Sequence, residues 1–358
     1  MKISKLLLSM FLLSVLIISC DNDGDNEVFE PKGDYENGLL ISGEGSFGGT
    51  SGSVSFISND FSTVEHQIYN NVNTGKELGR YVQSITFDNE NAYICVDTQN
   101  SITVVNRYTF AENGVISEGL VSPRYMTIVN GKGYATNWGT STWGNIIDDA
   151  FIAVINLATL TVERTIPVSV GPERIIEKNG KLYVSHKGGL GKNNIISVIE
   201  INNDEKSEII VKEKPDELFF DNQNNLVVLC EGDKYSASEV VPASIIKIDT
   251  NLKEVILDLE FPTGDYPELL EQNGNFIYYN VNSNIYRIEH SSTELSANSF
   301  IETDAVTPYG MAVKQDGLFL LDVGDYSGQS TLNVYDLTTQ TSNFTSKVAV
   351  IASKIYFN

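Results

Sequence analysis

A nine-residue pattern recurs seven times along this chain of 358 residues, and it restricts the fold more than any other feature. Each copy opens on a turn-forming pair, continues through mostly β-forming residues and, in five copies, closes on Gly. The copies start at Asn37, Asn91, Gly131, Gly180, Asn224, Gly274 and Asp316, which are 40 to 54 residues apart. Each copy predicts a strand that leaves a tight turn, so the chain consists of repeated β units.

Further strands surround each copy. A second strand follows it, as in "SITVVN" (101–106), and a third precedes most copies. This third strand begins with proline in five repeats, at Pro123, Pro172, Pro215, Pro267 and Pro308. Proline lacks the N–H that a sheet needs, so it is accommodated at the first residue of a strand. With a weaker fourth strand, such as "VERTIPV", each unit has the length and strand number of a propeller blade.

The two ends of the repeat region complement each other. The first copy lacks a preceding strand, whereas the C-terminal "VAVIASKIYFN" (348–358) contains a strand without a place in the seventh unit. We therefore predict an all-β fold, a seven-bladed β-propeller over residues 37–358, whose ring is closed when the C-terminal strand joins the first blade. Closure of this kind hides the strand edges that an open sheet would expose.

The N-terminus reads as an export signal. Lys2 and Lys5 precede an apolar run (6–18) that is short for a membrane span. The order Ile-Ile-Ser-Cys at 17–20 resembles a bacterial lipobox, which implies a signal peptide at 1–19 and lipidation of Cys20. Residues 20–36 are acidic and poor in apolar side chains, so we predict a flexible tether. Acidic residues behind such a cysteine accompany surface display in some outer-membrane lipoproteins, so we expect an outer-membrane location facing the exterior.

Charge and composition exclude several classes. The formal net charge of −23 argues against a nucleic-acid partner but suits a neutral or cationic ligand. Cys95 and Cys230 lie in apolar runs of different repeats, so we expect buried free thiols rather than a disulfide. Three histidines and no paired-cysteine motif give no zinc signature, so we expect no cofactor and leave a structural calcium ion open.

Loops on one face of the predicted ring are long. If the strands of a blade are named A to D outward from the axis, the B–C and D–A loops share the face called the top. Five B–C loops are extended: 46–52, 140–149, 189–194, 233–243 and 325–330. These loops, together with Trp138 just before the second of them, contribute five aromatic residues: Phe47, Trp138, Trp143, Tyr235 and Tyr326. These rings suit flat or amphipathic ligands, although Trp138 and Trp143 could instead pack against the scaffold.

Charged and aromatic residues at the inner strands point to the same face. The D–A connections contribute Tyr81, Arg124, Tyr125, Arg174 and Tyr309, and the end of one B strand contributes His186 and Lys187. Two interpretations stay open for the arginines, which either contact a ligand or join neighbouring blades through Glu173, Asp216 and Glu217. His186 is either a ligand contact or proton-transfer group, or a hydrogen-bonded interblade residue.

A catalytic interpretation has less support. Propeller lactonases and lyases need a metal or a His/Glu constellation at the channel mouth. Strand-end residues could in principle coordinate a hard cation here: Glu44, Asn137, Glu173, Asp216, Glu231, Asn280 and Asp322. Polar residues are common at strand ends, and no spacing singles these out. We therefore predict that the protein is not an enzyme.

Two blade copies, "PRYMTIVNGKGYATNWG" (123–139) and "PERIIEKNGKLYVSHKG" (172–188), resemble the YVTN/YncE-type seven-bladed propellers. The first-blade "GLLISGEGSFGGTSGSVSFI" (38–57), together with the leader, is more similar to a branch of surface lipoproteins that includes the BtuG proteins. Those proteins capture cobalamin and pass it to a TonB-dependent outer-membrane transporter.

The resemblance implies a lipid-anchored protein that captures a small-molecule nutrient on its top face and delivers it to such a transporter. Cobalamin or another corrinoid is the leading candidate, followed by another cofactor, a metal chelate or a glycan. The alternatives are a surface adhesion propeller that binds a protein or glycan and, with less support, a propeller lactonase or lyase.

Overall fold

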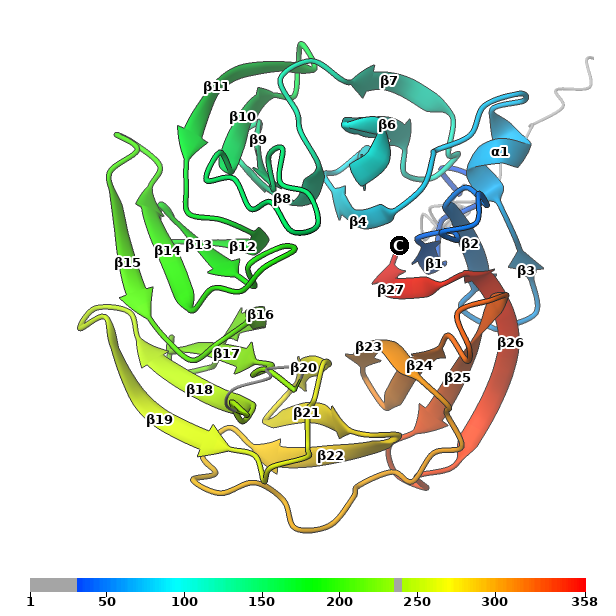
Figure 1. The fold of residues 1–358 in the computed structure, drawn as a ribbon. Coiled ribbons are helices and arrows are strands. Elements are labelled where there is room, and N and C mark those ends of the chain that lie inside the picture. Colours follow the sequence, from blue (N-terminus) through cyan, green and yellow to red (C-terminus); the bar gives the residue numbers. More distant parts are fainter. Residues whose placement is uncertain (1–30, 235–239) are drawn as a thin grey trace, which may run out of the picture. The chain divides into compact units, whose positions relative to one another are not determined.

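The computed structural model describes residues 31–234 and 240–358. Residues 32–358 form one compact unit, in which seven antiparallel sheets are arranged in a ring (Figure 1). This confirms the predicted seven-bladed β-propeller. The predicted signal peptide and Cys20 lie outside the described residues.

Six blades have four strands and one has three. Blade 1 comprises β27 (Ala352–Phe357), β1 (Gly38–Gly43), β2 (Ser53–Ser58) and β3 (Val64–Glu65). Blade 2 comprises β4 (Val82–Phe87), β5 (Asn91–Val96), β6 (Ser101–Asn106) and β7 (Glu112–Ile116). Blade 3 comprises β8 (Pro123–Val129), β9 (Lys132–Asn137), β10 (Phe151–Asn156) and β11 (Thr161–Pro167). Blade 4 comprises β12 (Pro172–Lys178), β13 (Lys181–His186), β14 (Ile195–Glu200) and β15 (Lys206–Ile210).

The remaining blades follow the same order from the axis outward. Blade 5 comprises β16 (Pro215–Phe220), β17 (Leu226–Cys230), β18 (Ser244–Asp249) and β19 (Glu254–Glu260). Blade 6 comprises β20 (Leu270–Asn273), β21 (Phe276–Val281) and β22 (Asn284–Glu289). Blade 7 comprises β23 (Pro308–Lys314), β24 (Gly317–Asp322), β25 (Gln329–Asp336) and β26 (Ser342–Val350).

The short helices α1 (Ile68–Val72) and η1 (Asp97–Gln99) lie in connections. No helix in the described ranges is long and apolar enough to cross a membrane.

The ring closes as predicted. The C-terminal strand β27 pairs antiparallel with β1, with Leu39 opposite Phe357. The amide of Asn358 donates to the carbonyl oxygen of Tyr35 at 2.6 Å, and its Oδ1 accepts from Arg107 Nε at 2.7 Å. Tyr35 is itself buried between blades 1 and 2, and the compact unit begins at Lys32, inside the segment predicted as a tether.

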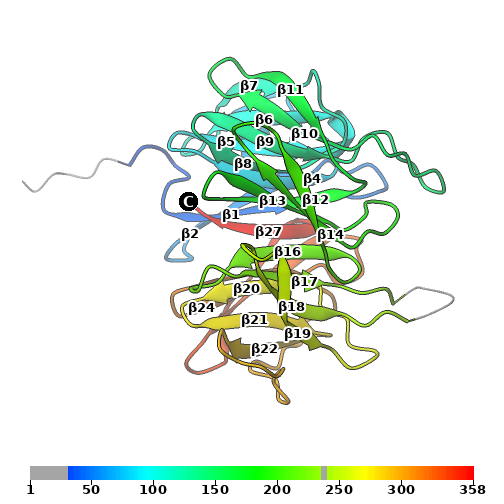
Figure 2. The ribbon, with the colours of Figure 1, turned by 90° about the vertical axis from the view of Figure 1, so that its left-hand side faces the viewer.

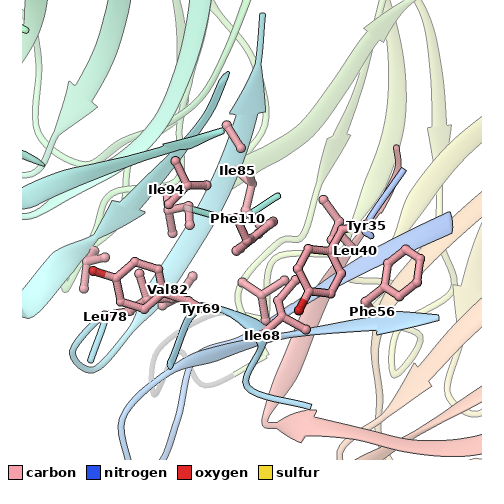
Figure 3. Close-up of a cluster of buried hydrophobic side chains, with 14 residues drawn as sticks. Tyr35, Leu40, Phe56, Ile68, Tyr69, Leu78, Val82, Ile85, Ile94 and Phe110 are labelled. Atoms are coloured by element: carbon pink, nitrogen blue, oxygen red, sulfur yellow. The ribbon is translucent and has the colours of Figure 1, made fainter. Parts of the chain in front are cut away.

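The hydrophobic core is distributed over the seven interfaces between neighbouring blades. Between blades 1 and 2, for example, Leu40 and Phe56 pack with Val82 and Ile94 (Figure 3). A propeller strand has its two faces covered by adjacent blades, which is why the B and C strands are apolar at nearly every position. Cys95 and Cys230 lie within this core as free thiols, as predicted.

Blade 6 departs from the prediction of seven four-stranded blades. After β22 the chain runs along the outer side of the blade as an irregular segment, residues 290–307 (Figure 1). It pairs with β22 through one bridge, Ile285 to Ile301. This segment has no alternation of apolar and polar residues that would give a strand a buried face.

Candidate functional site

Most of the innermost strands open with β-bulges that direct side chains towards the axis. In β8, Pro123 pairs with Asn137 and Met126 with Ala135, so Arg124 and Tyr125 both oppose Thr136. The Thr136 hydroxyl accepts the backbone N–H of Tyr125 at 3.0 Å. Strands β12 and β16 shift register at the equivalent place. A bulge re-aims the residues that it leaves unpaired, so each of these strands presents a polar pair to the channel.

These residues surround a cavity of about 100 Å³, here called the channel mouth. All seven blades contribute to its wall, which consists of Glu44, Gln83, Arg124, Tyr125, Glu173, Arg174, Lys187, Asp216, Glu217, Glu231, Glu268, Leu269, Tyr309, Ser353 and Lys354. Charged groups therefore dominate the centre of the ring. The described residues contain no cluster of three or more His, Cys, Asp or Glu arranged to hold a metal ion.

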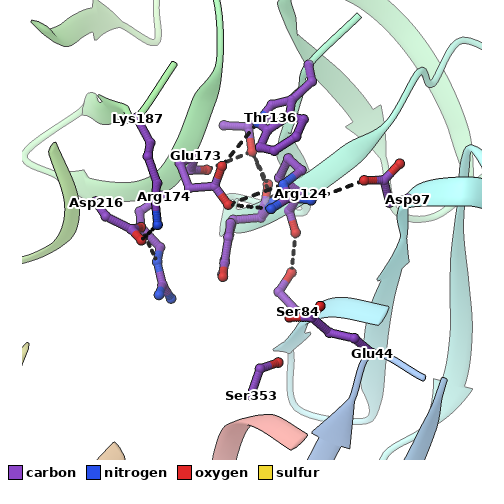
Figure 4. A network of polar contacts seen from close by, with 12 residues as sticks. Glu44, Ser84, Asp97, Arg124, Thr136, Glu173, Arg174, Lys187, Asp216 and Ser353 are labelled. Carbon is purple, nitrogen blue, oxygen red and sulfur yellow. Dashed lines mark hydrogen bonds and ion pairs between the residues drawn. The ribbon is translucent and has the colours of Figure 1, made fainter. Parts of the chain in front are cut away.

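Arg124 is the centre of one ion-pair network (Figure 4). Its guanidinium contacts Glu173 at 2.8 Å and Asp97 at 3.1 Å. It also lies 3.8 Å from the centre of the Trp138 ring, whose Nε1 donates to Glu173 at 3.1 Å. Burial alone would lower the pKa of Arg124, but the Coulombic attraction of Glu173 and Asp97 outweighs burial and raises it. Trp138 is thereby fixed against the scaffold, which is one of the two interpretations left open above.

A second network continues into the next blade. Arg174 pairs with Asp216 at 3.0 Å and with Glu217, and Lys187 bridges Asp216 at 2.9 Å and Glu231 at 2.7 Å. Burial would raise the pKa of Asp216, but the positive charges of Lys187 and Arg174 lower it well below its ordinary value. The arginines of blades 3 and 4 thus join each blade to the next.

Other polar groups at the channel mouth have little or no compensation. Burial raises the pKa of Glu44, whose carboxylate accepts a hydrogen bond from the Tyr309 hydroxyl at 3.2 Å. Glu271 lies in β20, outside the channel-mouth lining, and burial together with the nearby Glu217 raises its pKa to about 8. Within the described ranges, the buried Ser353 hydroxyl has no hydrogen-bond partner and Lys354 enters no salt bridge. The channel mouth therefore retains unused hydrogen-bonding capacity.

His186 belongs to a different group of residues, which fasten loops. A residue at or next to the end of several B strands forms a hydrogen bond with the D–A loop before its own blade: Asn137 with Val121, Asn280 with Leu269, and Asp322 with Thr307. His186 does the same in blade 4, since its Nδ1 lies 3.3 Å from the carbonyl oxygen of Val170 and its Nε2 lies 2.9 Å from the Ser197 hydroxyl.

The His186 side chain is fully buried, and burial lowers its pKa to about 4. Its partners lie in and just before its own blade, so it is hydrogen-bonded within blade 4 and not between blades. This placement corrects the expectation of a surface contact, and we exclude His186 from the candidate ligand-binding set.

The aromatic residues predicted for the B–C loops of the top face, here called the aromatic rim, differ in how far they are exposed. Phe47 is 86% exposed and Trp143 is 83% exposed, whereas Tyr326 is 46% exposed and packs edge-on against Tyr309 with ring centres 5.6 Å apart. Tyr81 is half-buried and lies against Arg80. Figure 2 shows the blades from the side, with loops extending from the ring. Tyr235 lies outside the described residues.

The sequence analysis missed Gln83, Ser353 and Lys354. A signal was available, because aligning "ASKIYF" (352–357) with "PERIIE" (172–177) places Ser353 opposite Glu173 and Lys354 opposite Arg174. The C-terminal strand lacks the opening proline, which hid this equivalence.

Comparison with known proteins supports the fold. A functionally unknown protein from Desulfotomaculum acetoxidans DSM 771 has a similar structure, with a TM-score of 0.65 and 14% identity over 90% of this chain and 99% of that chain. Dihydro-heme d1 dehydrogenase NirN in complex with DHE gives a TM-score of 0.56 and 11% identity over 92% of this chain and 76% of that chain. The computationally designed Ika8 protein gives a TM-score of 0.57 and 10% identity over 91% of this chain and 92% of that chain.

At such identities the structures show a shared fold and nothing finer. None of the curated proteins compared matches the chain. A family model described as "Domain of unknown function (DUF5074)" matches residues 37–318. Because this match covers well over half of the chain and ends within the seventh blade, the protein belongs to the DUF5074 family.

Proposed function

We propose that this protein is a lipid-anchored surface protein that captures a small-molecule nutrient on its top face and delivers it to a TonB-dependent outer-membrane transporter. One observation carries the proposal: loops of three different blades hold Phe47, Trp143 and Tyr326 at least partly in solvent, around a charged channel mouth. The lipobox-like sequence at 17–20 supports the anchor.

The exposed aromatic rings offer contact area to a ligand. A tryptophan or phenylalanine left more than four-fifths exposed forgoes roughly 2–3 kcal/mol of burial, so a surface that keeps two such residues on one rim suits a partner that covers them. The ion-paired side chains of the channel mouth and the Ser353 hydroxyl can form hydrogen bonds with polar groups of the ligand. A large macrocycle with polar side chains matches this arrangement, which favours cobalamin, the ligand suggested by the resemblance to the BtuG proteins.

A second candidate is a surface adhesion protein that uses the same rim for a protein partner. Ile146 and Ile147 extend the apolar surface beside Trp143 and are 44% and 37% exposed. A broad apolar rim of this kind suits a protein surface as well as a small ligand.

The test is calorimetric titration of residues 20–358, made soluble by Cys20→Ser, with cyanocobalamin. We expect 1:1 binding that Trp143→Ala and Phe47→Ala each weaken about tenfold, which corresponds to roughly 1.4 kcal/mol. Leu252→Ala is the matched control, because Leu252 is 64% exposed but lies in the turn between β18 and β19, on the opposite face from the B–C loops.

Equal loss in the Leu252 variant would show that the rim is not the site. Absence of binding at micromolar protein would reject cobalamin, and the same variants would then be tested against glycans and metal chelates.

A further inference from the structure

A cleft of about 550 Å³ lies where blade 6 lacks its fourth strand. One wall is the end of β19, the outermost strand of blade 5, and the other is formed by residues 293–297 of the segment after β22. The volume falls within the range of small-molecule sites. It shares no residue with the channel mouth or with the aromatic rim.

The floor of the cleft is aromatic. The rings of Tyr279 and Tyr286 are stacked, with centres 5.6 Å apart and planes inclined by 15°, and Phe261 meets Tyr279 edge-on at 5.4 Å. The Tyr279 hydroxyl accepts the backbone N–H of Ser296 at 3.1 Å, which holds the outer wall in place. Leu295 packs against the same cluster. The floor and one wall are therefore fixed before any ligand binds.

The rim of the cleft is acidic. Four carboxylates line it, from Asp258, Glu260, Asp265 and Glu294, and no lysine, arginine or histidine is among the described lining residues. Lys212 pairs with Asp258 at 2.9 Å and with Glu260 at 2.6 Å. Within the described part of the chain no ion pair reaches Asp265 or Glu294. Two negative charges thus border an aromatic floor without a counter-ion from the protein.

We propose that this cleft binds an amphipathic organic cation, an amine attached to a flat or aromatic group. The flat part would lie on Tyr286, because aromatic faces favour stacked or edge-on rings. The ammonium would lie between Asp265 and Glu294, where the carboxylates and the negative face of the tyrosine ring attract a positive charge. All four carboxylates repel an anion. A neutral aromatic ligand could stack on the floor of the cleft but would lack the attraction between its charge and the carboxylates.

This inference is independent of nutrient capture on the top face. The rim variants Trp143→Ala and Phe47→Ala leave the cleft intact, and the cleft variants leave the rim intact. A failure of one proposal is therefore distinguishable from a failure of the other.

The test uses phenethylammonium as the probe and residues 20–358 with Cys20→Ser, labelled with ¹³C in the tyrosine rings. The Tyr286 resonance is assigned by its loss in Tyr286→Phe. We expect a saturable shift of the Tyr286 signal, at least tenfold weaker binding of the neutral benzyl alcohol, and no binding of phenylacetate. Affinity should fall as salt is added, because the charges at the rim are exposed.

The decisive comparison is between two pairs of substitutions that change the net charge equally. Asp265→Asn with Glu294→Gln should weaken phenethylammonium at least fivefold and leave benzyl alcohol unchanged. Glu118→Gln with Asp316→Asn, at exposed positions in other blades, should leave both ligands unchanged. A non-saturable shift, equal affinity for the amine and the alcohol, or equal losses in the two charge variants would overturn the proposal.

Discussion

Replacing Arg124 with methionine tests whether the channel mouth is a structural element. The Arg124 side chain is 13% exposed, and its partners Glu173 and Asp97 are 4% and 18% exposed. Methionine fills most of the same volume but leaves Glu173 with the Trp138 N–H as its remaining side-chain partner. Removing one member of a buried ion pair costs about 3–5 kcal/mol, because the other charge stays buried without compensation. We expect about 3 kcal/mol, the lower end, since Asp97 retains contact with water.

The assay is urea unfolding followed by tryptophan fluorescence, because Trp138 lies on the Arg124 guanidinium. Glu173→Gln and the double variant complete a thermodynamic cycle. The double variant should recover about 2 kcal/mol of the summed losses, since it removes the unpaired charge together with its partner.

Arg164→Met is the control for this series. Arg164 pairs with Asp204 at 2.7 Å, but the two side chains are 38% and 31% exposed, so its loss should cost less than about 1 kcal/mol. If Arg124→Met costs no more than Arg164→Met, the channel mouth is screened by water and the argument for a buried network fails.

Three further predictions test other parts of the structure. His186 keeps a folded-state pKa of about 4, below the ordinary 6.5, so its neutral form adds stability that is complete above pH 6.5 and is lost, by up to about 3 kcal/mol, as the pH falls to 4. Thermal unfolding of His186→Gln between pH 4 and 7 should therefore show a flatter pH dependence than the original protein. Gly171→Ala should destabilise by more than 2 kcal/mol in urea, since φ is +62° and a Cβ would lie 2.1 Å from the carbonyl carbon of Gly188. Gly180→Ala, with positive φ but open space around the Cβ, should cost less, and equal losses would contradict the steric argument. Asn358→Ala should speed hydrogen exchange in β27 and cost about 2 kcal/mol, because it removes the side-chain hydrogen bonds to Tyr35 and Arg107; unchanged exchange would show that strand pairing alone closes the ring.

The fold could be predicted because the strand and turn signals of each repeat depend on residues that are close together in the sequence. Prolines at 123, 172, 215 and 308 begin inner strands as expected. Pro267 does not, because β20 begins at Leu270 after a loop fastened by Asn280. Blade 6 also lacks its expected fourth strand. Residues 290–307 have no alternation of apolar and polar side chains, so the absence of this strand could have been predicted from the sequence.

The site could be predicted only in part, and the two tryptophans show why. Trp138 directly follows β9, so the strand end brings it to Arg124 and Glu173 of the inner ring. Trp143 lies farther along the same loop and remains 83% exposed. The sequence placed them together on one rim. The difference arises from contacts with blade 4, whose Glu173 is 35 residues from Trp138 in the chain.

The residues that stabilise the ring are different from those proposed to bind the ligand. Ion pairs at Arg124 and Arg174 join the inner strands of blades 3, 4 and 5, and residues such as His186 fasten the loops that enter each blade. Most of the D–A loops are thereby held in place by contacts within the ring, whereas the B–C loops that carry Phe47 and Trp143 extend into solvent. Rigid support under variable loops is the usual condition for precise binding. Substitutions in the channel mouth should therefore change stability first, and substitutions at the loop tips should change ligand affinity without changing stability.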